Sequence, residues 1–295
     1  MCDLSIIIPV YHALDELKAC LNSLEKVSGL DKAEVILVND CPGSETAEFL
    51  DEYAKLHDVV LINNSENLGF IKSCNKAMSA ATAPVLLLLN SDTEVPVSLV
   101  NKVIDCFHSD ERIACAAPLG GRAFYKKLFP VDVNQADSLV ERKLGKQKYI
   151  QTLVPHGFCF AIRKSVVDQI GMFDEVFGKG YCEENDLACR ALRAGYINVV
   201  MVNMYVLHKV SASFGSGEAS QRISHNKQIL NARWKKFLHQ YKKDNPRLFK
   251  EDRYVRRFFP WYYRCLLPLS AVFVTGILCL FPKTSKIYKK LKQFK

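Results

Sequence analysis

The 295-residue sequence lacks the short motifs that mark several common cofactor and metal sites. No G-x-G-x-x-G pattern follows the first predicted strand and no G-x-x-x-x-G-K-S/T pattern occurs anywhere, which argues against a dinucleotide-binding Rossmann site and a P-loop. The 11 cysteines form no C-x-x-C pair and have no histidines at zinc-finger spacing. They indicate small buried hydrophobic residues in a reducing compartment.

The composition also excludes several protein classes. With 49% hydrophobic and 24% charged residues, 14 glycines and 11 prolines, the chain is neither disordered nor collagen-like, nor a small disulfide scaffold. Its first residues have no basic region and only a short apolar run, so they do not predict a signal peptide. A chain of this length can bury one large core, and we expect one α/β domain with an appendage.

Positive charge is concentrated in the C-terminal part of the chain. The net charge is +9, from 40 Lys and Arg against 31 Asp and Glu. Residues 231–295 hold 17 Lys and Arg and 3 Asp and Glu, a net +14, so residues 1–230 hold 23 against 28, a net −5. A uniformly basic domain would indicate nucleic acid, whereas a basic tail beside an apolar run indicates anionic lipid. We expect no nucleic-acid partner.

The first 90 residues alternate apolar strands with amphipathic helices. Continuous apolar runs predict strands, and apolar residues at helical spacing predict the helices between them. Strands that are apolar on both faces and separated by helices indicate a parallel sheet covered on both sides. The predicted strands are residues 5–10, 34–40, 59–64 and 84–90, and the predicted helices are residues 14–24, 44–56 and 69–81.

Polar residues gather where these four strands end. Ligands of such sheets bind outside the carboxyl ends of the strands, so these residues are expected to line one crevice. They are Pro9 and Tyr11, Asn39 and Asp40, Asn63, Asn64, Asn67 and Gly69, and Asn90, Ser91 and Asp92. A crevice lined by carboxylates needs a cation, or sugar and base donors, opposite them.

Six motifs, in this order and spacing, carry a resemblance to a known family. They are SIIIPVY at 5–11, VND at 38–40, NLGF at 67–70, LLNSDTEV at 88–95, IGMFDE at 170–175 and YCEENDLACRALRAGY at 181–196. The sequence resembles the family 2 glycosyltransferases over roughly residues 4–210, and within them a rhamnosyltransferase-like, glycan-assembly subgroup. The resemblance implies the GT-A fold, which is an α/β, Rossmann-like, mostly parallel sheet with helices on both faces.

This resemblance also implies a division of the chain. Residues 1–230 are expected to form the GT-A domain, with residues 1–118 as the nucleotide-sugar half and residues 119–230 as the acceptor half. Residues 119–155 show no clear periodicity, and we interpret them as a variable region that helps to form the acceptor pocket. Residues 231–295 are expected to be a basic, partly hydrophobic membrane-association region.

The donor diphosphate and its metal are assigned to the end of the fourth strand. Asp92 occupies the place of the family's DxD aspartate, although Asn90 stands where the first carboxylate is usual. A hard divalent cation, Mg²⁺ or Mn²⁺, prefers carboxylate oxygens and uses one or two of them together with substrate phosphates. By resemblance His208 completes the metal or diphosphate site, and Asn90 and Ser91 flank the nucleotide sugar. The alternative for Asp92 is a turn aspartate that caps a helix.

The nucleotide is assigned to the ends of the first three strands. Asp40 is similar to the family residue that accepts a hydrogen bond from a pyrimidine ring, and Tyr11, after Pro9, lies where a ring packs on the base. Asn67 and Gly69 suit a close backbone approach, and Lys72 lies one helical turn further on, within reach of a phosphate or of solvent. Ordinary turn, surface and loop roles remain open for these residues.

The catalytic base is expected in the EEND cluster. Most family 2 enzymes invert configuration, so one carboxylate takes the proton of the attacking acceptor hydroxyl. Glu184 occupies the place of the Asp that usually does so and is the first choice, Glu183 is the second, and Asp186 is expected to orient the site. Acidic residues near a helix start also interact favourably with the helix dipole. His156, in VPHGFCF, is a candidate for acceptor contact.

The tail indicates a membrane surface. Residues 265–281 are 17 uncharged, mainly apolar residues, at the lower edge of what a spanning helix needs. Basic flanks on both sides and the interruptions at Pro268 and Gly276 favour a peripheral or re-entrant anchor on the cytoplasmic face of a membrane. A buried helix of a C-terminal subdomain is the alternative.

The sequence therefore predicts a metal-dependent, inverting, hexosyltransferase-like enzyme. It would move a sugar from a nucleoside diphosphate donor, of UDP or dTDP type, to a glycan acceptor that is lipid-linked, in surface polysaccharide or glycolipid assembly. Two alternatives remain. A sugar nucleotidyltransferase would need a Gly-rich phosphate loop after the first strand, which PVYHALDEL lacks, and an inactive membrane scaffold would not need the EEND carboxylates.

Overall fold

A computed structural model describes residues 2–121, 132–144, 148–209, 216–246 and 248. Residues 1–245 belong to one compact unit, which contains all but two of the described residues. The apolar run at 265–281 lies outside the described residues. Within the described part of the chain, no helix is both long enough and apolar enough to cross a membrane.

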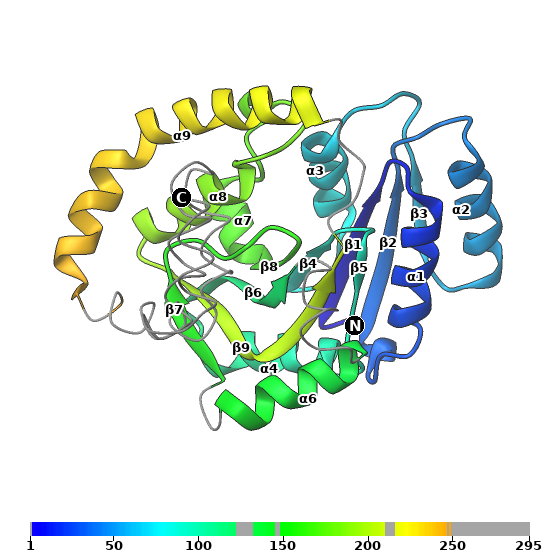
Figure 1. Cartoon of the computed structure of the whole chain (residues 1–295), viewed down its shortest axis with the longest axis horizontal. Coiled ribbons are helices and arrows are strands. Elements are labelled where there is room, and N and C mark those ends of the chain that lie inside the picture. The colour runs from blue at the N-terminus through cyan, green and yellow to red at the C-terminus, as the bar shows by residue number, and fades with distance from the viewer. Residues whose placement is uncertain (1, 122–131, 145–147, 210–215, 247, 249–295) are drawn as a thin grey trace, which may run out of the picture. The chain divides into compact units, whose positions relative to one another are not determined.

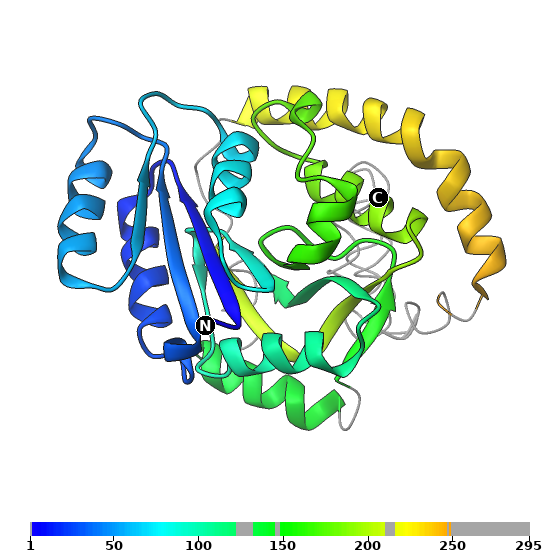
Figure 2. The same ribbon diagram turned by 180° about the vertical axis from the view of Figure 1, so that it is seen from behind.

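The N-terminal half is a parallel sheet, as the apolar runs predict. Strands β3, β2, β1 and β4 are neighbours in that order and all pair in parallel (Figures 1 and 2). The elements are β1 (Leu4–Val10), α1 (Leu14–Leu24), η1 (Leu30–Lys32), β2 (Ala33–Asn39), α2 (Glu45–Leu56), β3 (Val60–Asn63), α3 (Phe70–Ala80) and β4 (Val85–Leu89). Their bounds agree with the predicted ones to within one or two residues.

Beyond β4 the sheet is mixed, so the prediction of a mostly parallel sheet is wrong for this half. Strand β8 pairs antiparallel with both β4 and β6, whereas β6 and β9 are parallel. Short strands β5 and β7 pair antiparallel with β9. An apolar run shows that a strand is buried but does not show its direction. The strands are β5 (Thr93–Glu94), β6 (Ile113–Gly121), β7 (Tyr149–Thr152), β8 (Cys159–Arg163) and β9 (Ile197–His208).

Helix α6, strand β7 and the continuous length of helix α9 were not predicted from the sequence. The helices of this half are α4 (Leu99–Ser109), α6 (Val133–Leu144), α7 (Lys164–Ile170), η2 (Glu175–Phe177), α8 (Glu183–Arg193) and α9 (Ser216–Asp244). Helix α6 and strand β7 lie within residues 119–155, which we interpret from the sequence as a variable region. Helix α9 runs continuously through residue 230, so the boundary expected there falls inside a helix.

Two apolar layers cover the sheet, which confirms the prediction of helices on both faces. Alternate residues of β1, such as Ile6 and Ile8, pack with α1 and α4, whereas Ile7 packs on the opposite face with α3, α7 and α8. Side chains of a strand alternate between faces, so one strand serves both layers. The nine described cysteines are free, and all but Cys2 are buried, as expected for small hydrophobic residues.

The Glu34 side chain of β2 links this strand to β1 and to the residues that precede β4. The Glu34 carboxylate accepts hydrogen bonds from the Ser5 hydroxyl and from the backbone and hydroxyl of Thr82. Burial alone would raise the pKa of Glu34, but these hydrogen bonds outweigh it and hold the pKa below its ordinary value. The ionised form therefore stabilises the fold.

We expect Glu34→Gln, which keeps the shape and removes the charge, to lower the free energy of unfolding by about 1–2 kcal/mol at pH 7. The difference from wild type should shrink as the pH falls through the lowered folded pKa, because a carboxylate of this kind contributes only while ionised. Urea unfolding at pH 7 and pH 3.5 measures both effects. Exposed Glu52→Gln is the control, and an equal loss at both pH values would contradict the account.

Candidate active site

The structure brings Asp92 and His208 together at one end of the sheet. Asp92 precedes β5 and His208 ends β9, and the pairing of Thr93 with His208 places the two side chains side by side. The His208 Nε2 atom lies 3.1 Å from Asp92 Oδ1 and 3.5 Å from the Asn90 amide nitrogen. Ser91 is half-buried in the same turn.

This pair fits a divalent cation. A carboxylate oxygen beside an imidazole nitrogen is a donor set that Mn²⁺ accepts, and Mg²⁺ commonly uses a single carboxylate with phosphate and water. The described residues contain no cluster of three or more His, Cys, Asp or Glu suited to a metal, so two protein ligands would leave positions for a diphosphate. Asp92 and His208 are the residues that would hold the ion.

A neighbouring aromatic ring, not singled out from the sequence, supports His208. The Phe158 ring stacks on the His208 ring with centroids 5.0 Å apart and an interplanar angle of 15°. Phe158 also lies against Gly120, where an added Cβ would lie 2.1 Å from the Phe158 ring, so a larger residue there would displace Phe158. The Phe158 carbonyl also accepts a hydrogen bond from the backbone N–H of Asn90.

Asp40 organises the loop between β3 and α3. Its carboxylate, 3% exposed, accepts hydrogen bonds from the backbone N–H groups of Leu68 (2.7 Å) and Gly69 (2.8 Å) and from the Asn64 amide (2.9 Å). An ionised carboxylate has about four acceptor positions, so one remains for a base. Asp40 is therefore first a support for this loop, and contact with a pyrimidine ring stays a prediction.

The same loop meets the segment before α8. Gly69 has φ of 81°, and a Cβ there would lie 2.8 Å from the Lys179 side chain and 3.1 Å from its Cα, so only glycine is accommodated without strain. Lys179 donates a hydrogen bond to Asn67 at 3.1 Å. Lys72 forms an exposed ion pair with Glu175 at 3.7 Å. The loop between β3 and α3 is thus in contact with the segment that leads to Glu183 and Glu184.

Pro9 and Tyr11 lie at the end of β1. Pro9 pairs with Val38 of β2 and is half-buried, and Tyr11 is 39% exposed, with its ring 3.9 Å from that of His12. An exposed ring next to the Asp40 loop is available for stacking. Its contact with a nucleotide base remains a prediction.

Glu183 and Glu184 lie in the first turn of α8 rather than before the helix. Burial raises the pKa of Glu183 well above its ordinary value, and the charge of Glu184 raises it further. Burial also raises the pKa of Glu184, while hydrogen bonds from its own backbone and from Asn185 oppose the shift. Burial therefore disfavours a negative charge on both of these neighbouring carboxyl groups, and more strongly on Glu183. Among the described residues, Glu183 Oε2 has no hydrogen-bond partner.

Residues 156–158 contact both Glu184 and His208, one of the two candidate metal ligands. A Cβ on Gly157 would lie 3.1–3.3 Å from the Cγ, Cδ and Oε1 atoms of Glu184, so the glycine leaves room for that side chain. His156, next in the chain, has its ring 5.1 Å from that of Phe158, which in turn stacks on His208. The acceptor candidate, the base candidate and the metal candidate therefore belong to one contiguous site.

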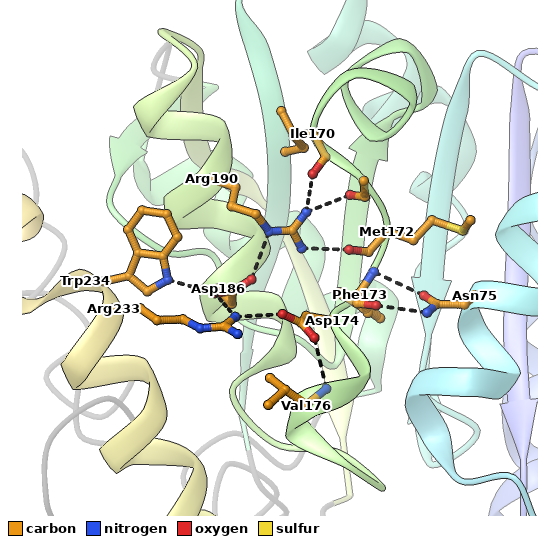
Figure 3. A network of polar contacts seen from close by, with 11 residues as sticks. Asn75, Ile170, Met172, Phe173, Asp174, Val176, Asp186, Arg190, Arg233 and Trp234 are labelled. Carbon is orange, nitrogen blue, oxygen red and sulfur yellow. Dashed lines mark hydrogen bonds and ion pairs between the residues drawn. The ribbon is translucent and has the colours of Figure 1, made fainter.

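Asp186 has a different role from its two neighbours. Its fully buried carboxylate accepts hydrogen bonds from Arg190 Nε (2.8 Å), Trp234 Nε1 (2.7 Å) and Arg233 (3.2 Å), as Figure 3 shows. Arg190 in turn donates to backbone carbonyls at the end of α7. Through these three donors the Asp186 carboxylate holds α8 in place. Arg233 and Trp234 come from the segment expected to form a separate tail.

The loop that leads into α8 has an unusual backbone. Tyr181 and Cys182 have φ values of 76° and 75°, in the left-handed region, where a non-glycine residue costs about 1–2 kcal/mol. Strain of this kind persists only where the surroundings hold it, and it is common at functional sites. Here it immediately precedes both candidate catalytic carboxylates.

The comparison with protein families decides the classification. The model of "Glycosyl transferase family 2" matches residues 5–171, more than half of the chain. The chain belongs to glycosyl transferase family 2. This confirms the resemblance drawn from the sequence motifs.

Curated relatives of this family 2 chain are glycosyltransferases. The probable glycosyltransferase YdaM of Bacillus subtilis is 23% identical over 65% of this chain and 47% of its own length. The poly(ribitol-phosphate) beta-glucosyltransferase of Bacillus spizizenii is 28% identical over 49% of this chain and 24% of its length. The N-acetylglucosaminyl-diphospho-decaprenol L-rhamnosyltransferase of Mycobacterium tuberculosis is 37% identical over 24% and 23%. The chain thus aligns with about a quarter to a half of these relatives.

Solved structures show the same GT-A-like α/β fold. GalNAc-T7 with UDP, GalNAc and Mn²⁺ has a TM-score of 0.61 and 19% identity, covering 77% of this chain and 48% of that one. A mannosyltransferase of Pyrobaculum calidifontis, in complex with GDP-Man and Mn²⁺, has a TM-score of 0.57 and 16% identity, covering 99% and 83%. At these identities the likeness establishes the fold alone.

In this family 2 chain, we expect Glu183→Gln to change how stability depends on pH. A carboxyl group with a raised folded pKa favours folding while protonated, so its contribution declines as the pH rises above the unfolded value of about 4.3. The variant is neutral throughout and should gain stability over wild type from pH 5.5 to pH 7.5, by at most about 1.4 kcal/mol per pH unit. Urea unfolding at the two pH values measures this difference.

Exposed Glu175→Gln, nearby in the same segment, is the matched control and should leave the pH dependence unchanged. Parallel stability curves for wild type and Glu183→Gln would show that Glu183 is not held neutral.

Proposed function

We propose that the protein is an inverting glycosyltransferase that moves a sugar from a nucleoside diphosphate donor to a glycan acceptor. The observation that carries the proposal is the contact between Gly157 and Glu184 next to the stacked Phe158 and His208. It supports a site in which a carboxylate with a raised pKa and the pair Asp92 and His208 are linked through residues 157 and 158. Family membership supports transfer as the reaction class.

Glu184 is the proposed base. In a single displacement, the oxygen of an acceptor hydroxyl forms the bond to the anomeric carbon while the bond to the diphosphate oxygen breaks and its electrons leave with the diphosphate. The hydroxyl proton passes to the Glu184 carboxylate. A raised pKa makes Glu184 a better proton acceptor than an ordinary glutamate.

Asp92 and His208 are the proposed holders of Mg²⁺ or Mn²⁺. Such an ion, when bound, neutralises negative charge on the leaving diphosphate. The Asn90 amide and the stacked Phe158 ring keep the His208 imidazole turned toward Asp92. Two structural neighbours contain Mn²⁺ with UDP or with GDP-Man, which supports a divalent ion and a nucleotide-sugar donor here.

The donor and the acceptor are proposed from the relatives and from charge. A UDP or dTDP sugar suits the Asp40 loop, which keeps one carboxylate acceptor position for a pyrimidine ring. Relatives that glucosylate poly(ribitol-phosphate) or rhamnosylate a decaprenol diphosphate sugar support a role in surface glycan assembly. A lipid-linked acceptor would agree with the basic C-terminal part of the chain.

A membrane surface is the proposed site of action, on its cytoplasmic face. The C-terminal half of α9 carries exposed basic residues at spacings of one, four, seven and eight, which places them on one face of the helix. The buried Trp234 lies on the opposite, core-facing side. Basic side chains on one exposed face attract anionic lipid. These residues are Lys235, Lys236, His239, Lys242 and Lys243.

We expect Glu184→Gln to keep donor binding and to lower turnover about 100- to 10,000-fold, because the variant cannot accept a proton. Donor binding is measured as the thermal shift with UDP-glucose, UDP-N-acetylglucosamine, GDP-mannose or dTDP-rhamnose, with and without Mn²⁺. Turnover is measured as release of the nucleoside diphosphate. Exposed Glu111→Gln is the matched control.

In the same assays, Asp92→Ala should lose the part of donor binding that depends on Mn²⁺, with exposed Asp58→Ala as its control. Wild-type turnover retained in both Glu184→Gln and Asp92→Ala would refute the assignment. Transfer of a nucleotide from a triphosphate to a sugar phosphate would instead identify a nucleotidyltransferase, and binding without any turnover would identify an inactive scaffold.

We expect the full-length chain to sediment with vesicles of phosphatidylglycerol and phosphatidylcholine at low salt. A chain ending at residue 245, the limit of the first compact unit, should bind more weakly, and neutralising Lys235, Lys236, Lys242 and Lys243 to Gln should weaken it further. Each exposed lysine contributes about 1 kcal/mol at an anionic surface. A full-length protein that stays in the supernatant without detergent would contradict membrane association.

A further inference from the structure

A buried amide on α9 reaches into the loop that leads to the acidic cluster. Asn226 is 2% exposed. Its Nδ2 atom lies 2.9 Å from the carbonyl oxygen of Phe177, 3.0 Å from that of Gly180 and 2.8 Å from that of Tyr181. The amide has two N–H hydrogens, so one of them is shared between two of the three carbonyl groups, which lie within five consecutive residues.

Two of these carbonyls belong to the peptide units Gly180–Tyr181 and Tyr181–Cys182, which lie directly before Glu183 and Glu184 in the chain. The peptide bonds are trans, so the C=O and N–H of each unit point in opposite directions. The backbone N–H of Tyr181 opposes the rise in the pKa of Glu183, and that of Cys182 opposes the rise in the pKa of Glu184. Asn226 thus holds the C=O of each unit, and the N–H of the same unit favours the ionised form of a carboxylate that follows.

The backbone of this loop needs such support. Tyr181 and Cys182 both have left-handed φ values, which non-glycine residues adopt only under constraint. Trp234 and Arg233 of α9 also bind Asp186 of α8 (Figure 3). Asp186 comes after these peptides in the chain, so this contact does not itself fix their orientation. Without the Asn226 amide, α8 would remain packed while the two peptide units relax.

We infer that Asn226 is a positioning residue for the acidic pair, acting through the peptide units Gly180–Tyr181 and Tyr181–Cys182. This inference rests on the proposed function, in which Glu184 is the base. Under this inference α9 orients the carboxylates, although this helix carries none of the family motifs. Neither the Asn226 side chain nor the two carbonyls it holds need touch the substrate.

The first test is Asn226→Ala in the full chain. With the best-bound of the four nucleotide sugars and Mn²⁺, we expect kcat to fall at least tenfold while the donor KM changes less than threefold. Asn75→Ala is the matched control, because the Asn75 amide also bonds a loop backbone, at Phe173, but not these peptides (Figure 3). Its kcat should stay within twofold of wild type.

The second test is rescue by Cys182→Gly. Glycine adopts a positive φ without strain, so the loop should depend less on Asn226 when residue 182 is glycine. In the Asn226→Ala background, Cys182→Gly should recover at least threefold of the lost kcat. A purely structural role for Asn226 predicts that the added loss of the buried Cys182 side chain lowers the activity further, and this result would overturn the inference.

The third test does not depend on activity. Hydrogen exchange followed by mass spectrometry should show faster exchange at residues 178–186 in Asn226→Ala, with protection elsewhere unchanged. Exchange that is unchanged in this segment, or faster throughout the chain, would overturn the inference. If the wild-type chain turns over no nucleotide sugar, the proposed function fails while the exchange result still decides whether Asn226 holds the loop.

Discussion

The buried carboxylate of Asp186 is the interaction on which the arrangement of the site depends. A charge removed from water in this way is stable only when donors surround it, and here the donors come from α8 itself and from α9. Arg190, held by Asp186, also binds carbonyls at the end of α7. The Asp186 carboxylate therefore fixes the start of α8 relative to α7 and α9. Glu183 and Glu184 lie in the same turn of α8, so their backbone positions are fixed with it.

Three carboxylates within four residues have three different environments. Asp186 accepts hydrogen bonds from three side chains, Glu183 has a buried oxygen without a partner in the described structure, and Glu184 lies against Gly157. Environments that separate neighbouring carboxylates in this way are how a protein assigns acid, base and structural roles to the same residue type. Tyr181 and Cys182, directly before α8, adopt strained left-handed backbone conformations, and this strain accompanies the positioning of the carboxylates.

The sequence predicts the N-terminal half of the fold well because its strands are short, continuous apolar runs. Strand β1 and helix α3, for example, fall within one or two residues of expectation. The same signal carries no information on strand direction, so the antiparallel pairing of β8 with β4 was not predictable from it. Helix α6 was missed although Val133, Ala136, Val140 and Leu144 recur at helical spacing, because the residues around them in 119–155 show no such pattern.

In the candidate site, too, some residues could be predicted from the sequence and others could not. Asp92, Glu183 and Glu184 are visible in the sequence because they belong to motifs of chemically distinctive residues. Asn226 and Phe158 are ordinary residue types far along the chain from the groups they support, and only the fold brings them together. Trp234 lies in a segment whose charge predicts a membrane tail, and its role in binding Asp186 depends on a contact 48 residues away.

The central claim is a single displacement at the anomeric carbon assisted by one carboxylate. Its most direct measurement is the configuration of the sugar released when water replaces the acceptor, followed by NMR immediately after Mn²⁺-dependent hydrolysis of an α-linked donor such as UDP-glucose. The account predicts that the β anomer forms first and that the α anomer appears only by later mutarotation. Initial formation of the α anomer would contradict it.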